Sequence, residues 1–317
     1  MTDTTSSSVR FARLSAWVAA LRLHFYPVSW LGYGVGAAAA TALGATFQPA
    51  PFWFGWGVLV FLEAATVLSN EYVDYPSDRR NRNHSAFTGG SRVLVDERLT
   101  FAQLRSGVAV ALLLATACAA GLLATLEGPR LPVMVAVALM VTLTLGYTLP
   151  PLKLSYRVLG EVDVAVTTGA GVVLCGFVFQ GAPWQQPLPW LLGASLGLAI
   201  LPGITLAGIP DREADRAAGK RTLAVRFGAG RACAIAAAAT VFAAVAFLLV
   251  DRLAIGAAAG GWLTVAYLLM LLHAGAVLVV VGRVARIAAP RRIDRAMILS
   301  LSFVIWFVAV PLLRLLG

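Results

Sequence analysis

The stretch from Phe52 to Asp78 decides the fold and reads FWFGWGVLVFLEAATVLSNEYVDYPSD. Its first part is apolar and about as long as the 20 residues that a helix needs to cross a bilayer. The apolar run ends in an acidic cluster, in which Asn70, Asp74 and Asp78 recur every four positions. Carboxylates beside lipid are costly unless another group compensates them. The stretch therefore predicts a membrane helix that ends at a site where a ligand offsets negative charge.

A second acidic cluster repeats this spacing, because Asp211 and Asp215 also follow a long apolar stretch. Positions four apart share one face of a helix. In the first cluster, however, Pro76 disfavours helical geometry at Tyr75, which would place Asp78 already in the loop. Mg²⁺ is typically held by one or two carboxylates together with substrate phosphates. We interpret the two clusters as facing each other around Mg²⁺ ions and a diphosphate, with these ligands: Asn70, Asp74, Asp78, Asp211 and Asp215. The alternative is that they are solvated acids paired with neighbouring arginines, a common arrangement at this spacing.

The composition indicates a protein that lies mostly in lipid. Of the 317 residues, 59% are hydrophobic and only 13% are charged, against about 25% charged residues in soluble domains. The net charge of +10 does not indicate nucleic-acid binding, because the basic residues are spread over short loops between apolar spans. The three cysteines form no Cys-x-x-Cys motif, so we expect neither a disulfide framework nor a zinc site.

The apolar stretches predict an all-α, polytopic membrane protein with nine transmembrane helices around a central cavity. The expected spans are 14–45, 52–73, 101–125, 131–149, 160–181, 188–209, 231–250, 260–282 and 295–316. We expect a kink in the first span, which contains Pro27. Turn residues predict breaks at 48–51, 127–130, 181–183 and 289–290. Pro210 suits the first position of a new short helix.

The distribution of basic residues predicts the orientation. Twenty Lys and Arg fall in the tail and the loops on one side, against three on the other. The positive-inside rule then places the N-terminus and both acidic clusters in the cytoplasm, in an inner membrane. We expect residues 1–13 to be a mobile tail and residues 14–317 to be one domain. Asp74 and Asp211 lie 137 positions apart, which suggests two four-helix repeats plus one helix.

At the two acidic clusters the sequence resembles the UbiA-type family of intramembrane prenyltransferases. That family carries an Asn-x-x-x-Asp-x-x-x-Asp motif after helix two and an Asp-x-x-x-Asp motif after helix six. The similarity extends to the flanks at 208–222 and at 147–161, and nine helices agree. The resemblance implies a prenyl diphosphate substrate and Mg²⁺ in a lipid-facing cavity. Glu71 stands where the family usually has Asp, so the resemblance assigns it no metal bond.

The resemblance also implies roles for individual residues. Asp74, Asp211, Lys153 and Tyr147 would be catalytic. Asn70 would bind diphosphate together with basic side chains that reach the outer phosphate oxygens. The candidates are Arg22, Arg79, Arg82, Arg92, Lys153 and Lys220, with Arg157 and Arg221 as further possibilities. For each of these basic residues the alternative is that it only sets the membrane topology. Glu63 lies deeper on the face of Asn70, and we expect it to orient Asn70 or to pair with Arg22.

The implied reaction is ionisation of an allylic diphosphate, followed by attack of an electron-rich ring carbon of an aromatic acceptor. Five aromatic residues are candidates for stabilising the cation through their π faces: Phe25, Tyr26, Trp30, Tyr72 and Tyr147. Packing or an interfacial belt is the alternative for each of them. The stretch 88–94, TGGSRVL, resembles the branch that prenylates 1,4-dihydroxy-2-naphthoate for menaquinone. Its glycines would let the backbone approach a ligand closely, or would only form a turn.

Two other functions fit parts of this pattern. A terpene cyclase on the same scaffold would ionise the same diphosphate without an acceptor. A secondary transporter would also use intramembrane acids and repeats, although the acids here gather at one membrane face. The bilayer is the expected partner, and nucleic acid is not. The acceptor, the length of the prenyl chain and the oligomeric state stay open at this point.

Overall fold

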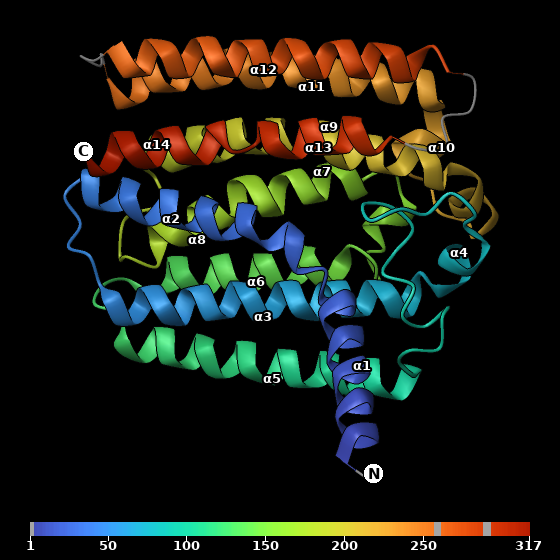
Figure 1. Cartoon of the computed structure of the whole chain (residues 1–317). Helices are drawn as coiled ribbons and strands as arrows, with labels where there is room; N and C mark the ends of the chain where they lie inside the picture. Colours follow the sequence, from blue (N-terminus) through green and yellow to red (C-terminus); the bar gives the residue numbers. More distant parts are fainter. Residues whose placement is uncertain (1–2, 257–260, 288–292) are drawn as a thin grey trace.

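The structure, a computed structural model, describes residues 3–256, 261–287 and 293–317, and within these ranges it consists of helices and loops without a β-strand. The long helices lie side by side with roughly aligned axes (Figure 1). In chain order the elements are α1 (Asp3–Leu21), η1 (Leu23–Phe25), α2 (Tyr26–Ala42), α3 (Pro49–Val73), α4 (Tyr75–Arg80), α5 (Phe101–Thr125), α6 (Arg130–Gly146), η2 (Leu154–Tyr156), α7 (Gly160–Ala165), η3 (Val166–Gly171), α8 (Val172–Val178), α9 (Pro187–Ala217), α10 (Leu223–Phe227), α11 (Ala229–Val250), η4 (Asp251–Ile255), α12 (Gly261–Ala285), α13 (Asp294–Phe303) and α14 (Trp306–Leu316).

The membrane character and the all-α class are confirmed. Within the described residues, seven helical segments are long and apolar enough to cross a membrane. They are Pro49–Val73, Phe101–Thr125, Gly160–Val178, Pro187–Ala217, Ala229–Ile255, Gly261–Ala285 and Asp294–Leu316. Helices α2 and α6 have 17 residues each, so both are shorter than these seven segments, although α6 is also apolar. The count of nine spans therefore stays a prediction. Residue 260, the predicted break at 289–290 and the basic pair Arg291 and Arg292 lie outside the described residues.

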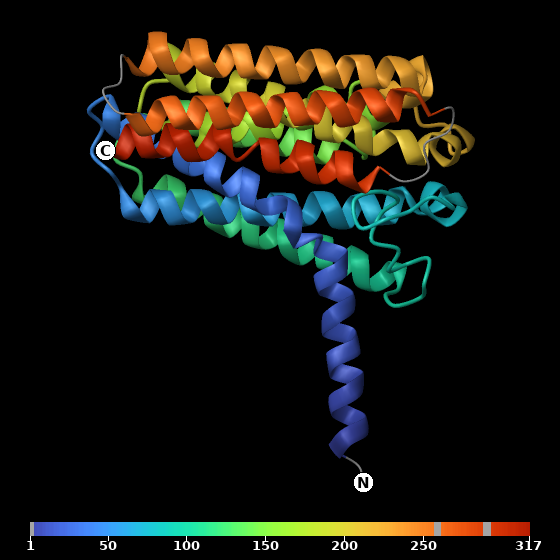
Figure 2. The ribbon, with the colours of Figure 1, turned by 45° about the horizontal axis from the view of Figure 1, so that its top comes forward.

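The first predicted span, 14–45, is divided into two helices. Helix α1 ends at Leu21, and Arg22 has a left-handed backbone with φ 51°. A short 3₁₀ turn follows before α2, which has Pro27 in its first turn, where proline is well tolerated. The chain therefore turns before Pro27 rather than at it. Helix α1 begins at Asp3, inside the stretch 1–13 that we expected as a tail, and it runs crosswise to the bundle (Figure 2).

Turn residues delimit the other helices largely as predicted. Helix α3 begins at Pro49, and α6 begins at Arg130 directly after Pro129. The prediction for Pro210 is wrong, because α9 continues through Pro210 to Ala217. A proline removes one backbone hydrogen bond, but membrane helices tolerate this where neighbouring helices cover the freed groups. Pro210 is buried in such a position.

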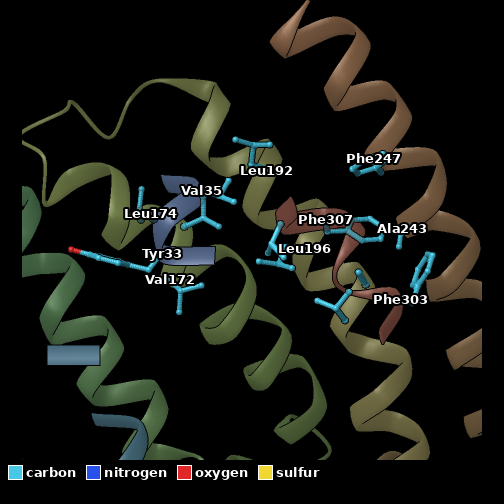
Figure 3. Packing of buried hydrophobic residues seen from close by; sticks show 14 of the residues in the cluster. Tyr33, Val35, Val172, Leu174, Leu192, Leu196, Ala243, Phe247, Phe303 and Phe307 are labelled. Atoms are coloured by element: carbon cyan, nitrogen blue, oxygen red, sulfur yellow. The ribbon is translucent and has the colours of Figure 1, made fainter. Parts of the chain in front are cut away.

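Close backbone contact joins the centre of the bundle. Gly36 on α2 faces α8, and a Cβ atom there would overlap the carbonyl group of Val173. A Cβ at Gly176 on α8 would overlap the carbonyl group of Tyr33 in the same way. Around this contact, buried side chains of α2, α8, α9, α11, α13 and α14 form the main hydrophobic cluster (Figure 3). This packing fixes the helices that surround the cavity described below.

Both acidic motifs lie at one end of the bundle. Helices α4 and α10 are found together at that end, and the C-terminus lies at the other (Figure 1). We call it the α4/α10 end. It also holds the loop of residues 81–100, which connects α4 to α5.

Candidate functional site

A cavity of about 330 Å³ lies between the helices and changes character along its length. At the α4/α10 end its lining includes Asn70 and Asp74 from the end of α3 and Asp211 from the end of α9. Farther along the same helices the lining is mainly apolar, with Leu59 on α3 and Ile200 on α9, although Glu63 on α3 also contributes to it. Asn70 and Leu59 are eleven residues apart on α3, as are Asp211 and Ile200 on α9, and eleven helical residues span about 16 Å. Over that distance the lining of each helix changes from charged to mainly apolar.

The first motif spans a bend between two helices. Asn70 lies in the last turn of α3, and Asp74 ends that helix. The chain bends at Asp74, and α4 begins at Tyr75 with Pro76 in its first turn. Asp78 is buried in α4. The three residues therefore share one cavity, but they do not lie along one continuous helix face as the spacing suggested.

The second motif is held by groups from α4 and from the loop that follows it. Both Asp211 and Asp215 lie in the last turns of α9. The Asn81 side-chain amide donates a hydrogen bond to Asp211 Oδ1 at 2.7 Å, and the Gly89 backbone N–H donates to Asp211 Oδ2 at 3.0 Å. The Ser77 hydroxyl donates to Asp215 Oδ1 at 2.8 Å. Segments more than 120 positions apart in the chain are thus joined through these carboxylates.

Lys220 joins the two motifs electrostatically. Its ammonium nitrogen lies 2.7 Å from Asp74 Oδ2 and 3.7 Å from Asp215 Oδ1. Burial lowers the pKa of the Lys220 ammonium, but the carboxylates of Asp74 and Asp215 outweigh burial and hold the pKa well above its usual value. Lys220 is therefore a permanent positive charge at the acidic end of the cavity.

The glycines at 89 and 90 bring the loop against the carboxylates. Gly89 has φ +78° and Gly90 has φ +70°, a conformation that strongly favours glycine. A Cβ atom at Gly90 would overlap the Asp78 carboxylate. The next residue, Ser91, donates its backbone N–H to Glu71 Oε1 at 2.7 Å. This loop therefore fits closely around Asp78, Glu71 and, through Gly89, the second motif.

Burial, together with neighbouring negative charge, changes the acidity of Asp78. Burial, followed by repulsion from Asp74 and Glu71, raises the pKa of Asp78 to about 8. Tyr156 lies beside Asp74 and donates its hydroxyl to Asp74 Oδ1 at 3.4 Å. Burial and then the Asp74 charge raise the pKa of Tyr156 to about 12. The acidic end of the cavity thus favours any ligand that brings positive charge.

The donor groups at this end are carboxylate and amide oxygens, which are the ligands that Mg²⁺ prefers. Within the described ranges, no three His, Cys, Asp or Glu side chains lie close enough together to hold one metal ion. The carboxylates surround the end of the cavity instead, and Lys220 lies between Asp74 and Asp215. One or two of these carboxylates suffice for Mg²⁺ when phosphates supply the remaining ligands.

Comparison with known proteins agrees with this arrangement. Residues 29–308 match the model of the UbiA prenyltransferase family. The chain belongs to this family. Its members are prenyltransferases, and the present chain is a UbiA-family prenyltransferase. No curated protein matches the sequence significantly.

Solved structures show the same fold. A UbiA homolog from Aeropyrum pernix K1, solved in its apo form, is 20% identical with a TM-score of 0.68, over 89% of this chain and 95% of the homolog. A UbiA homolog from Archaeoglobus fulgidus bound to GPP and Mg²⁺ is 19% identical with a TM-score of 0.57, over 93% of this chain and 99% of the homolog. The same archaeal protein bound to DMAPP and Mg²⁺ is 18% identical with a TM-score of 0.57, over 93% and 98%.

In this UbiA-family chain, eight of the residues expected from the sequence line one cavity. They are Arg22, Asn70, Asp74, Asp78, Tyr147, Asp211, Asp215 and Lys220. Asn70 also accepts a short hydrogen bond from the hydroxyl of Thr148. The motif spacing therefore identified residues that the fold brings together.

Six of the eight expected basic residues are not among those that line the cavity: Arg79, Arg82, Arg92, Lys153, Arg157 and Arg221. Arg79 and Arg82 are exposed. The Arg92 guanidinium donates to the Asp78 backbone carbonyl at 3.1 Å. The Lys153 ammonium lies over the Tyr156 ring, 4.7 Å from its centre, and so contacts a neighbour of Asp74. Their assignments as diphosphate-binding residues, and that of Lys153 as catalytic, stay predictions.

The sequence reasoning missed other lining residues. Glu161 and Asp163, at the start of α7, are buried and line the cavity. Glu161 accepts a hydrogen bond from the Leu223 backbone at 2.8 Å, which ties α7 to α10. Among the described residues, the Glu63 carboxylate accepts a hydrogen bond from the Ser29 hydroxyl at 3.3 Å. The partner of Glu63 is therefore Ser29 and not Asn70 or Arg22, as we had expected. A survey of every carboxylate inside an apolar span would have found these acids.

Two of the five aromatic candidates line the cavity, Phe25 and Tyr147. Tyr72 is exposed and packs against Phe101. Tyr26 and Trp30 pack against each other and are absent from this lining. The cavity thus has two of these aromatic side chains in its lining: Phe25 at the start of α2 and Tyr147 at the end of α6.

Proposed function

We propose that this protein transfers an isoprenyl or polyprenyl group from its diphosphate to an aromatic acceptor in a Mg²⁺-dependent reaction. The observation that carries this proposal is the single cavity that joins both acidic motifs to a hydrocarbon lining. A prenyl diphosphate has the same polarity, with a charged head and an apolar tail. The GPP and Mg²⁺ bound to the Archaeoglobus fulgidus homolog support this substrate class.

The acidic end of the cavity fits Mg²⁺ and a diphosphate together. The five motif residues offer carboxylate and amide oxygens, and Lys220 compensates only part of their charge. We assign Mg²⁺ binding to Asn70, Asp74, Asp78, Asp211 and Asp215. Bound Mg²⁺ would act as a Lewis acid that stabilises the charge developing on the leaving diphosphate.

The chain itself would bind, orient and protect the reactants. Lys220 and Arg22 line the acidic end and can contact diphosphate oxygens. The apolar lining excludes water, which would otherwise capture the allylic cation. In the reaction the carbon–oxygen bond to the diphosphate breaks and its electron pair leaves with the pyrophosphate. A ring carbon of the acceptor donates the pair that forms the new carbon–carbon bond, and a proton leaves that ring carbon.

We propose 1,4-dihydroxy-2-naphthoate as the acceptor, which would place the enzyme in menaquinone biosynthesis. The stretch 88–94 carries this assignment through its resemblance to that branch of the family. Its residues Thr88, Gly89 and Gly90 line the cavity, so the stretch is placed where it can contact an acceptor. The two glycines also have a structural role, because both have positive φ and a Cβ atom at Gly90 would overlap Asp78.

The location of the site follows from the charge distribution. We propose that the α4/α10 end faces the cytoplasm of an inner membrane, because the basic loops belong to that end. The acidic motifs would then take water-soluble diphosphate heads and Mg²⁺ from the cytoplasm, while the prenyl tail stays in the hydrocarbon part of the cavity. The division into two four-helix repeats plus one helix also stays part of this proposal.

The decisive experiment offers purified protein geranyl and longer prenyl diphosphates, with and without Mg²⁺. Each diphosphate is combined with 1,4-dihydroxy-2-naphthoate, with 4-hydroxybenzoate or with no acceptor, and products are identified by mass spectrometry. Prenylated naphthoate formed only with Mg²⁺ is the expected result. Prenylation of 4-hydroxybenzoate alone would contradict the menaquinone assignment. A hydrocarbon product without acceptor would identify a terpene cyclase.

A further inference from the structure

A second concave site lies outside the catalytic cavity, between α1, α3 and α5. It is a groove of about 680 Å³ with a largely apolar lining, within the range of about 300–1,000 Å³ that is typical of ligand sites. Its lining includes Arg13 and Trp17 on α1, Gln103 on α5, and Val60 on α3. None of the five metal-motif residues contributes to it.

The groove is polar at one end and apolar at the other. Along α5 its lining changes from Gln103 and Ser106 near the α4/α10 end to Val110 and Leu114 deeper in the bundle. Eleven residues of helix separate Gln103 from Leu114, which is about 16 Å. The hydrocarbon core of a bilayer is about 30 Å thick. The groove therefore extends through roughly one leaflet.

Helix α1 closes the polar end and lies where the bilayer surface should be. It runs crosswise to the spans (Figure 2), and its buried Ala16 and Ala20 pack in a cluster with residues of α3, α5 and the loop before α5. The side chains of Phe11 and Leu14 are 74% and 63% exposed. Apolar exposure on a helix that carries arginine and lies across the spans is typical of helices in the membrane interface. Arg13 then lies at headgroup depth.

Two polar groups of the groove lack partners in the protein. Arg13 takes part in none of the ion pairs among the described side chains. The Tyr26 side chain is buried, and its hydroxyl has no hydrogen-bond partner among the described residues. The Tyr26 hydroxyl is shielded from solvent, whereas the Arg13 side chain is exposed and can bind an anionic group.

We propose that this groove binds one anionic phospholipid of the adjacent leaflet. One acyl chain lies along α3 and α5, and the phosphate group lies beside Arg13. The charge favours a phosphodiester over a prenyl diphosphate, because among the described residues Arg13 is the single charged one in the lining, and none of them offers a carboxylate there that could hold Mg²⁺.

The lipid would contact the segment that leads to the active site. Leu21, Leu23 and Tyr26 line the groove, while Arg22 and Phe25 line the catalytic cavity. The same short turn thus separates the two sites. A lipid in the groove stabilises this turn, and with it the position of Arg22.

Delipidated protein tests the proposal by native mass spectrometry and by thermal unfolding. Phosphatidylglycerol and phosphatidylcholine with identical acyl chains are titrated separately. We expect one phosphatidylglycerol to bind per chain and to raise the Tm more than phosphatidylcholine does. Arg13→Ala should weaken phosphatidylglycerol binding about tenfold. Arg105→Ala is the matched control, since Arg105 is exposed on α5 but does not line the groove.

A second variant tests the groove without changing charge. Ser106→Trp fills the groove near its mouth and should abolish binding, whereas Ala109→Trp, at an exposed α5 position outside the lining, should not. Equal binding of both lipids that Arg13→Ala leaves unchanged would overturn the recognition of the headgroup. Geranyl diphosphate that displaces phosphatidylglycerol from the groove would show that the occupant is a prenyl chain instead.

Discussion

The ammonium group of Lys220 lies 2.7 Å from the carboxylate of Asp74, which joins the end of α9 to the end of α3 through one ion pair. Lys220 also lies 3.7 Å from Asp215. In the folded chain this cation stands among carboxylates that we assign to Mg²⁺. Lys220 therefore compensates part of the negative charge at the acidic end of the cavity. Removal of Lys220 should destabilise the protein most when metal is absent.

The first prediction concerns Lys220→Met. Loss of the cation leaves buried carboxylates without their partner, which typically costs about 3–5 kcal/mol. We expect the Tm of the variant in EDTA to fall clearly below that of the wild type. Added Mg²⁺ should raise the Tm of the variant more than that of the wild type. Turnover should also fall at least about tenfold, because the diphosphate loses a cationic contact.

The control for this variant is Arg221→Met, which removes an exposed neighbouring charge that does not line the cavity. Its Tm should differ little from the wild type, with or without metal. An equal Mg²⁺-induced rise in Tm for wild type and Lys220→Met would contradict the idea that Lys220 and the metal compensate the same carboxylates.

The second prediction separates the motif from ordinary helix charge. Asp215→Asn should lower Mg²⁺-dependent prenyl transfer by about a hundredfold or more, because a neutral amide holds less tightly than a carboxylate the Mg²⁺ that stabilises the charge on the leaving diphosphate. Glu213→Gln lies two residues away on the same helix, is exposed and does not line the cavity. It should retain near wild-type activity. Both variants should insert and purify as the wild type does, and retained activity in Asp215→Asn would remove the metal assignment.

Much of this site could be predicted because the motif residues are tied to helix ends. Asp74 and Asp211 each follow an apolar span of the same orientation, so any bundle must bring them to the same face of the membrane. Spacing and hydropathy carry that information without coordinates. The residues Asn70, Asp78 and Asp215 then follow from their offsets along the chain.

The basic residues could not be ranked in this way. Arg79 directly follows Asp78 in sequence, yet it is exposed, whereas Lys220 reaches Asp74 from a distant segment. Lys220 follows Gly219, whose φ of +80° turns the chain back at the end of α9. Only the tertiary packing that brings the end of α3 near the segment after α9 decides which cation enters the cavity. Local sequence contains no measure of that packing.

Pro210 and the first span show where local rules gave the wrong boundary. Pro210 was expected to begin a helix, but the surrounding helices bury α9 at that point and the helix continues. In the first span the chain breaks at Arg22, a residue with no intrinsic preference for left-handed backbone. Tertiary contacts of α1 with α3 and the loop before α5 outweigh the local preference at Arg22.

The third prediction concerns Gly90→Ala. A Cβ atom at Gly90 would overlap the Asp78 carboxylate, and the backbone has φ +70°. The substitution should displace Asp78 and lower turnover at least about tenfold. Gly219→Ala has a similar backbone, with φ +80°, but no atom lies within 4 Å of its Cβ position. Gly219→Ala should therefore lose only the backbone term of about 1–2 kcal/mol of stability. It should lower the Tm with little change in turnover.

Similar losses of turnover in Gly90→Ala and Gly219→Ala would show that backbone strain, rather than contact with Asp78, accounts for the effect. A Gly90→Ala variant as active as the wild type would mean that the loop shifts away from Asp78 without consequence.

The last prediction concerns the pH dependence of metal binding. The pKa of Asp78 is raised to about 8, so below that pH its carboxyl group is mostly protonated and cannot serve as an anionic ligand. A metal must then displace the proton, which makes the apparent affinity depend on pH. Affinity should rise by up to about tenfold per pH unit between pH 6 and 8 and level off above that range. Mn²⁺ alone, followed by electron paramagnetic resonance, measures this without the titration of a diphosphate.

Asp78→Asn supplies the control for this dependence, because its amide does not titrate. The variant should bind Mn²⁺ more weakly above pH 8 and should show a flatter profile between pH 6 and 8. The raised pKa of Asp78 fixes the direction of this effect. The metal competes with the Asp78 proton, and this proton leaves as the pH increases. Titration of Asp78 can therefore only raise the metal affinity as the pH rises. A profile for the wild type that is flat from pH 6 to 8, or one that Asp78→Asn leaves unchanged, would place Asp78 outside the metal site.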